Sequence, residues 1–247
     1  MPGGNTGIFA SSGVSSPLLQ WKASGNDQFT FNTTNNVSQW KVNTGTANPF
    51  TNQTANVYPT YNSTKKGVVF SLAANETLVV KNTPTVNLFK EASIYLVFQL
   101  NANSSWAYGH LFVQVATGAS VQQTRIYCDW GSTSACTMSA EHPGVPCPTA
   151  CRQMARRWHK TVHMPLGPGH IFPNREYILA RITINSTNLK YYAGKMASGT
   201  QSAIKSGTRS GGDTSLSPKD WAIGQGGRMT IHEVKSGHIL PKNTAWS

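Results

Sequence analysis

Short apolar or alternating segments recur along most of this chain, and they constrain its fold more than any other feature. The run 93–98, SIYLVF, is apolar on both sides, which is typical of a central strand. The segments 181–185, RITIN, and 229–234, MTIHEV, alternate, which is typical of strands with one face in water. Apolar residues spaced three and four apart do not persist beyond about three helical turns. The pattern therefore predicts an all-β chain with two packed antiparallel sheets and little helix.

The composition agrees with this prediction. Charged residues make up only 12% of the chain, and there are seven tryptophans and 22 glycines. Turn residues separate short strands, while aromatic and β-branched residues fill them. We expect strands at 28–33, 37–42, 67–72, 76–81, 91–100, 110–117, 121–130, 175–185, 188–195, 220–227 and 228–237.

Between Trp130 and Pro173 the strand pattern stops, and a segment rich in Cys, Pro and Gly follows. Connections of this length are usually functional, an inserted substructure, or disordered. We predict a single domain over 15–247 that an inserted loop interrupts at about 131–172. Residues 1–14 are predicted to form an N-terminal arm.

The charge balance bears on the partners. The chain has 21 Lys and Arg against 9 Asp and Glu, a formal net charge of +12. This favours an anionic partner, for which a nucleic acid, an acidic glycan and an acidic protein are the alternatives. The basic residues are scattered apart from groups at 152–160 and 190–209, and no nucleic-acid-binding motif accompanies them. Nucleic acid is therefore not the partner we expect.

The N-terminal 22 residues have no basic start and no sustained apolar core, so they are not expected to act as a secretory signal. The longest apolar run, SIYLVFQL at 93–100, is less than half the length of a membrane span. We therefore expect no membrane span.

The segment 147–163, CPTACRQMARRWHKTVH, contains the residue types of a Cys2His2 zinc site. Its candidate ligands are Cys147, Cys151, His159 and His163. Seven residues separate the two pairs, whereas about twelve or more are usual. Partly exposed strand or loop histidines explain His159 and His163 more simply than metal ligation does.

Disulfides are the alternative for these cysteines. Cys128 and Cys136 are nearby, and an even number of cysteines in a loop-rich segment fits two bridges. The four candidates, Cys128, Cys136, Cys147 and Cys151, allow three connectivities, and their order in the chain does not choose among them. Disulfides, zinc and reduced thiols stay open, with disulfides favoured. No cofactor is predicted.

The same insertion carries a basic and aromatic group that suits a contact surface. Loops on a rigid scaffold often carry function, and Arg and Trp are favoured in binding hot spots. Aromatic residues in nearby strands are candidates for a sugar-stacking platform, although most aromatics in a sandwich belong to the core. The candidates for glycan or partner contact are Trp106, Tyr108, Trp130, Arg152, Arg156, Arg157, Trp158 and Lys160, and Tyr191 and Tyr192 are further candidates for the platform.

Seven N-x-S/T sequons occur, a small excess over chance for a chain so rich in Asn, Ser and Thr. Such sequons suggest an exposed surface without proving that glycans are attached. The candidate glycosylation sites are Asn32, Asn36, Asn52, Asn62, Asn75, Asn103 and Asn185.

Several motifs together resemble one known superfamily. These are PLLQWKAS at 17–24, NNVSQWKVNTG at 35–45, YPTY followed by GVVFSLAANETLVV at 58–80, SIYLVFQL at 93–100, and DWAIGQGGRMTIHEVKSGHIL at 220–240. In this order they resemble the laminin-G-like branch of the concanavalin A-like lectin and glucanase superfamily. The resemblance implies a jelly-roll sandwich of two curved sheets, used for glycan binding or as a structural module. Versions with this opening are common in structural proteins of phages and large DNA viruses and in microbial surface proteins.

The superfamily includes glucanases, so glycoside hydrolysis is an alternative to glycan binding. Glycoside hydrolysis needs two carboxylates flanking the scissile bond, and the resemblance would place them together on one strand. No two of the nine acids lie within four residues of each other, and Glu233 is expected to be a structural partner in the last strand. The scarcity of acids also argues against a lectin-type calcium site. There is no G-x-S-x-G motif either, so the chain is predicted not to be an enzyme.

Three functional hypotheses follow. The first is a non-enzymatic structural module on the exterior of a virus or phage particle, with other particle proteins, itself and glycans as partners. The second is a lectin-like adhesion module of a microbial surface protein. The third, a glycoside hydrolase, is disfavoured because it lacks paired carboxylates. We favour the first and place the protein on a virion, or otherwise on an extracellular surface.

Overall fold

The fold is formed almost entirely by antiparallel strands. Apart from a single 3-10 turn, η1 (Asn26–Gln28), all regular structure that is described is strand, and every strand pairing is antiparallel. No helix in this part of the chain is long and apolar enough to cross a membrane. The all-β prediction is therefore confirmed. The computed structural model describes residues 17–71, 76–81, 92–101, 107–116, 119–130, 135–143, 161–165, 171–173, 177–184, 188–195, 205–208, 218–226 and 228–237.

A first series of paired strands, which we call the first ladder, joins the two ends of the described chain. Its central strand β8 (Ala92–Leu100) lies between β14 and β18. On its far side β18 pairs with β1 over one half of its length and with β6 over the other. The full order is β16 (Lys205–Thr208), β15 (Asn188–Lys195), β14 (Tyr177–Ile184), β8, β18 (Met229–Gly237), and then β1 (Leu19–Lys22) and β6 (Gly67–Phe70).

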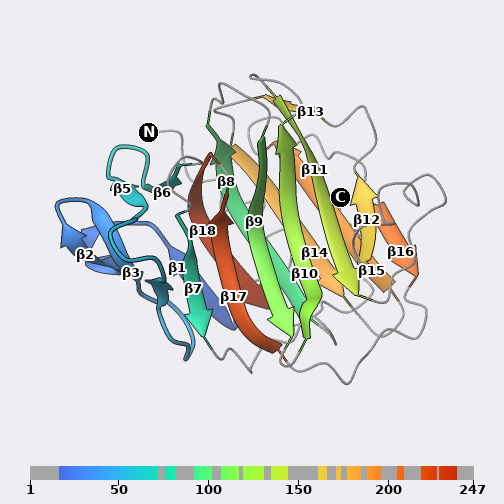
Figure 1. The fold of residues 1–247 in the computed structure, drawn as a ribbon, viewed down its shortest axis with the longest axis horizontal. Helices are drawn as coiled ribbons and strands as arrows, with labels where there is room; N and C mark the ends of the chain where they lie inside the picture. Colours follow the sequence, from blue (N-terminus) through green and yellow to red (C-terminus); the bar gives the residue numbers. More distant parts are fainter. Residues whose placement is uncertain are drawn as a thin grey trace.

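A second ladder is built from the middle of the chain. Here β17 pairs with β7 on one side and with β9 on the other, and β9 continues into β10 and β11. Figure 1 shows this ladder in front of β14 and β15. Its strands are β7 (Leu78–Lys81), β17 (Pro218–Gln225), β9 (Ala107–Ala116), β10 (Ala119–Trp130), β11 (Ala135–Pro143), β12 (Thr161–Pro165) and β13 (Ile171–Pro173).

Four short strands connect the two ladders. They are β2 (Phe29–Thr33), β3 (Asn36–Trp40), β4 (Phe50–Asn52) and β5 (Thr60–Asn62). Hydrogen bonding passes from β6 through β5, β3 and β4 to β7, so the 18 strands form one continuous, curled sheet. The coarse class, an antiparallel β fold, agrees with the sequence. Two separate sheets with jelly-roll connectivity stay a prediction.

Aromatic residues fill the space between the ladders. Trp21 of β1 meets Trp221 of β17 with ring centroids 6.0 Å apart, and it meets Phe50 of β4 at 4.9 Å. All three are fully buried. Every residue of β8 is also buried, as the run SIYLVFQL predicts for a central strand. Burying large aromatic rings contributes much of the hydrophobic stabilisation in a fold of this kind.

The prediction that no strand occurs between Trp130 and Pro173 is wrong, because β11, β12 and β13 lie in this segment. The sequence of β11, ACTMSAEHP, is mostly small or polar and has no apolar period. Its extended form comes from pairing with the backbone of β10, a tertiary effect that local propensity does not reveal. The predicted arm at 1–14 and much of the predicted insertion lie outside the described residues, so the domain limits stay predictions.

The outer edge of β1 is covered by residues 43–45. The Gln20 amide donates to the Thr44 carbonyl at 3.1 Å, and the Asn43 amide donates to the Gln20 carbonyl at 2.7 Å. The Asn43 side-chain oxygen accepts from the Lys22 amide. Covering an edge in this way satisfies its backbone groups and prevents pairing with another chain. Gly45 makes this approach feasible, since its φ is +83° and a Cβ there would lie 1.9 Å from the Leu18 carbonyl oxygen.

We predict that Gly45→Ala destabilises the fold. The positive φ alone costs about 1–2 kcal/mol for a residue with a Cβ, and the backbone overlap adds to this. Chemical denaturation of the variant should show the loss in the free energy of unfolding. Gly25→Ala is the matched control, because Gly25 is extended (φ −168°) and its Cβ would meet only the movable Asp27 side chain. Equal stability of both variants would contradict the requirement for glycine at position 45.

Candidate functional site

Most residues of the predicted contact loop lie outside the described residues. These are Trp106, Cys147, Cys151, Arg152, Arg156, Arg157, Trp158, His159 and Lys160. For seven other candidates only the backbone is described: Tyr108 in β9, Cys128 and Trp130 in β10, Cys136 in β11, His163 in β12, and Tyr191 and Tyr192 in β15. In register, Cys128 is opposite Met138 and Cys136 is opposite Phe172. Zinc, disulfides and the basic contact loop all stay predictions, and no cluster of three metal-ligating residues occurs among the described side chains.

The seven sequons also lie partly inside and partly outside the described residues. Asn75, Asn103 and Asn185 lie outside the described residues, whereas Asn32, Asn36, Asn52 and Asn62 belong to β2, β3, β4 and β5. Asn32 is exposed. The Asn52 side chain donates to the Thr54 carbonyl at 2.7 Å, and the Asn62 side chain accepts from the Lys65 amide at 2.9 Å. Of these four, Asn32 is the most accessible to a modifying enzyme, and its modification stays a prediction.

The first ladder has a second face, turned away from the core, which we call the polar face. In β8, Ile94, Leu96 and Phe98 belong to the core cluster, so Tyr95 and Gln99 lie on the polar face. The polar face continues onto the neighbouring strands, because residues directly opposite each other in an antiparallel pair lie on the same face. Each set of opposed residues forms a row across the strands. One row is Arg181, Tyr95, Lys235 and Gln20, and the next is Leu179, Val97, Glu233 and Lys22.

A β-bulge in β18 places two consecutive side chains on this face. Ile231 pairs with Phe98 and Glu233 pairs with Val97, so the register shifts by one residue between them. A bulge of this kind changes the direction of a side chain and is common beside functional sites. Ile231 and Val234 remain in the core, while His232 and Glu233 both reach the polar face.

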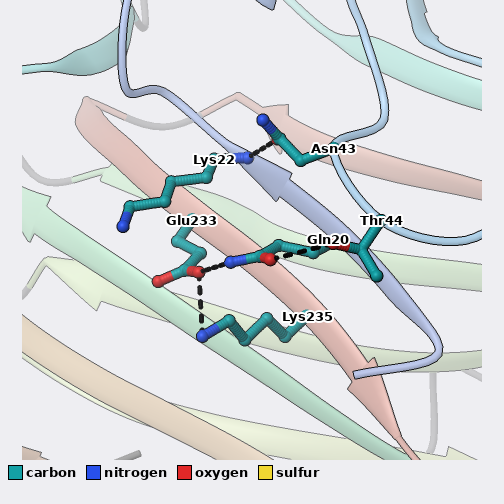
Figure 2. Close-up of polar contacts among 6 residues, drawn as sticks. All are labelled: Gln20, Lys22, Asn43, Thr44, Glu233 and Lys235. Carbon is teal, nitrogen blue, oxygen red and sulfur yellow. Dashed lines mark hydrogen bonds and ion pairs between the residues drawn. The ribbon is translucent and has the colours of Figure 1, made fainter. Parts of the chain in front are cut away.

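Glu233 is held by two neighbours. One of its carboxylate oxygens accepts a hydrogen bond from the Gln20 side-chain amide and lies 3.0 Å from the Lys235 ammonium (Figure 2). The Thr44 hydroxyl donates to the Gln20 side-chain oxygen at 3.3 Å, which links the edge cover of β1 to the same cluster. Glu233 is largely buried. Its carboxylate therefore ties β18 to β1, in agreement with the expected structural role.

His232 connects three elements. Its Nδ1 lies 2.9 Å from the Lys66 carbonyl oxygen, and its Nε2 lies 3.2 Å from the Gln99 side-chain oxygen. Burial lowers the pKa of His232, and the bond to Lys66 offsets this only in part. Both partners are oxygen acceptors, so a neutral ring, which carries one N–H, donates to one of them at a time. The Tyr177 ring packs against His232 with centroids 4.8 Å apart.

Arg181 and Tyr95 form the centre of the face. The guanidinium carbon lies 5.5 Å from the centroid of the Tyr95 ring, and Nε donates to the Thr183 hydroxyl at 2.7 Å. Tyr95 is fully buried, and its hydroxyl lies near the Ser93 side chain. Burial raises the pKa of Tyr95, which the nearby Arg181 partly offsets. The phenol is therefore neutral near neutral pH.

Paired carboxylates are not found on this face. Among its described side chains, Glu233 is the one carboxylate. Glu76 is buried near Ser71, whose amide donates to it, and burial raises the pKa of Glu76 to about 7. Asp220 lies on β17 in the second ladder, and Asp27 is exposed in η1. Two-carboxylate glycoside hydrolysis has no support from these positions.

We predict that His232 makes stability depend on pH. The folded-state pKa of His232 lies below the ordinary histidine value of 6.5, so the folded chain resists protonation where the unfolded chain accepts it. The contribution is present above pH 6.5 and is lost as the pH falls through the lowered pKa. Urea unfolding at pH 7.5 and at pH 5 should therefore show a smaller loss of stability on acidification in His232→Gln than in the parent. An equal loss in both would refute this role.

No protein-family model and no curated protein matches the chain. Among solved structures, it is similar to the alginate lyase from Klebsiella pneumoniae, with a TM-score of 0.52 and 9% identity over 92% of this chain and 98% of that one. It is also similar to Trypanosoma rangeli sialidase in complex with 2,3-difluorosialic acid, with a TM-score of 0.51 and 9% identity over 92% of this chain and 32% of that one. A third is the CBM2 module of the evolved Dit of Lactobacillus casei BL23 phage J-1, with a TM-score of 0.47 and 12% identity over 89% of this chain and 94% of that one. At these identities the first two show a shared β fold and nothing about activity, and the laminin-G-like assignment stays a prediction.

Proposed function

We propose that this chain is a non-catalytic module that binds polysaccharide at the polar face, through the side chains of β1, β18 and β14 that reach solvent there. The observation that carries the proposal is Tyr177. Its side chain is 43% exposed, more than any other large hydrophobic side chain that is described. It sits at the start of β14, directly opposite Gln99 of β8 in register. An exposed aromatic ring beside amide groups suits a sugar, which offers an apolar ring face and hydroxyl groups at its edge.

The packing of His232 against Tyr177 also suits polysaccharide binding. His232 packs against the ring and is itself held by Lys66 and Gln99, so the aromatic surface is fixed before a ligand arrives. Preorganised side chains lose less entropy on binding. Strands also hold a site more rigidly than loops do.

The absence of catalysis belongs to the same proposal. Glu233 is engaged by Gln20 and Lys235, and a second carboxylate does not accompany it among the described side chains of the face. We expect the protein to bind polysaccharide without releasing reducing ends. Release of reducing ends that is abolished by changing one acid would support the glycoside hydrolase instead.

We further propose that the module lies on the exterior of a virus or phage particle, with itself and other particle proteins as partners. The support is the resemblance of its opening segments to the laminin-G-like modules of phage and large DNA virus structural proteins. Mass spectrometry of purified particles and a symmetric assembly in solution would test this location. Location on a cell surface would favour the adhesion module, which shares the same binding face.

Tyr177→Ala should weaken binding to the polysaccharide that the parent binds. Truncating a preorganised aromatic contact typically costs more than 1 kcal/mol, about a fivefold or larger loss of affinity. Isothermal titration or affinity electrophoresis in polysaccharide gels would measure the change. Tyr58→Ala is the matched control, since Tyr58 is a half-buried tyrosine on the loop before β5, outside the strands that carry the polar face. Unchanged affinity in Tyr177→Ala would refute the proposed platform.

A further inference from the structure

Resting on the proposed function, we infer that the ligand is an anionic polysaccharide, one that carries carboxylate or sulfate groups along its chain. The inference depends on the charge and spacing of the side chains on the polar face. It names the class of ligand, which the platform at Tyr177 alone does not specify.

The described side chains of the polar face include three cations and one carboxylate. The cations are Lys22 of β1, Lys235 of β18 and Arg181 of β14, and the carboxylate is Glu233. Glu233 has both Gln20 and Lys235 as partners on one oxygen. The face is therefore positive overall in this region, in line with the net charge of +12. A groove or face of one sign attracts and retains ligands of the opposite sign.

The cations are spread across the sheet and do not form a single cluster. From Lys22 on β1 to Arg181 on β14 the register crosses three strand spacings, roughly 14 Å in total at about 4.8 Å each. A single sugar acid can contact one of these positions at a time. Lys22 is exposed and Arg181 is partly exposed, so a polymer with repeated anionic groups can contact both, which gains affinity by multivalency.

Arg181 is oriented for such a group. Its Nε is bound by the Thr183 hydroxyl, which in turn accepts from the Ser93 hydroxyl at 3.1 Å. Its guanidinium carbon lies over the Tyr95 ring. A fixed, planar guanidinium matches the two oxygens of a carboxylate or sulfate better than a flexible ammonium does. Because Arg181 is only partly exposed, an interaction with it is screened less than one at the open surface.

The test compares each acidic polymer with its neutral counterpart on the full chain. Polygalacturonate is paired with carboxyl-reduced polygalacturonate, and dextran sulfate is paired with dextran. We expect at least tenfold tighter binding to the acidic member of a pair, and weaker binding as salt is raised. Binding only to polygalacturonate would identify the carboxylate as the recognised group, and binding only to dextran sulfate would identify the sulfate.

Variants separate this face from the net charge of the protein. Arg181→Gln should lower affinity for the acidic polymer about tenfold, and Lys22→Gln should lower it severalfold. Lys81→Gln, which removes an exposed lysine from β7 in the second ladder, is the control and should bind as the parent does. Lys22 is also exposed, so its variant keeps the test valid even where Arg181→Gln fails to fold.

Three outcomes would overturn the inference. Equal binding of acidic and neutral polymers would leave the proposed function standing and remove the anionic class. If Lys81→Gln weakened binding of the acidic polymer as much as Lys22→Gln does, the binding would depend on the overall charge of the protein and not on the polar face. Binding of none of the four polymers, and of no neutral glycan on an array, would overturn the proposed function together with the inference.

Discussion

The pairing of β18 with β8 on one side and with β1 on the other is the constraint on which the rest of the structure depends. It brings the start and the end of the described chain together in one ladder. The one-residue bulge within β18 then decides which side chains face outward. Without the shift after Ile231, strict alternation would place His232 and Glu233 on opposite faces. One of them would enter the core beside Ile231 and Val234, where an ionisable group is costly.

The bulge also gives His232 and Glu233 different contacts. Glu233 faces β1 and joins Gln20 and Lys235, which fixes the edge of the ladder. His232 contacts the Lys66 carbonyl in the turn before β6, together with Gln99 and Tyr177. One irregularity in a strand thus supplies both a structural tie and the support for an exposed aromatic ring. Bulges at functional sites are commonly kept for such a change of direction.

Sequence patterns were sufficient for the strands that alternate or are wholly apolar. SIYLVFQL predicts a central strand and is β8, and ARITI within β14 alternates as it packs one face on the core. The prediction that MTIHEV alternates misses the bulge, because the consecutive polar residues His232 and Glu233 break the alternation at the point where the register shifts. The polar face could not be predicted either. Its members come from four segments far apart in sequence, and only their pairing shows that Arg181, Tyr95 and Lys235 form one row.

The core and the polar face are coupled through single strands. In β1, Leu19 and Trp21 enter the core, while Gln20 and Lys22 lie on the polar face. The indole N–H of Trp21 has no hydrogen-bond acceptor among the described residues, at a cost of about 1–3 kcal/mol, so close aromatic packing must offset it. That packing, against Trp221 and Phe50, fixes the height of β1 above the second ladder. Because alternate residues share one backbone, the same contacts fix where Gln20 meets Glu233, and the arrangement of charges on the polar face is set from within the core.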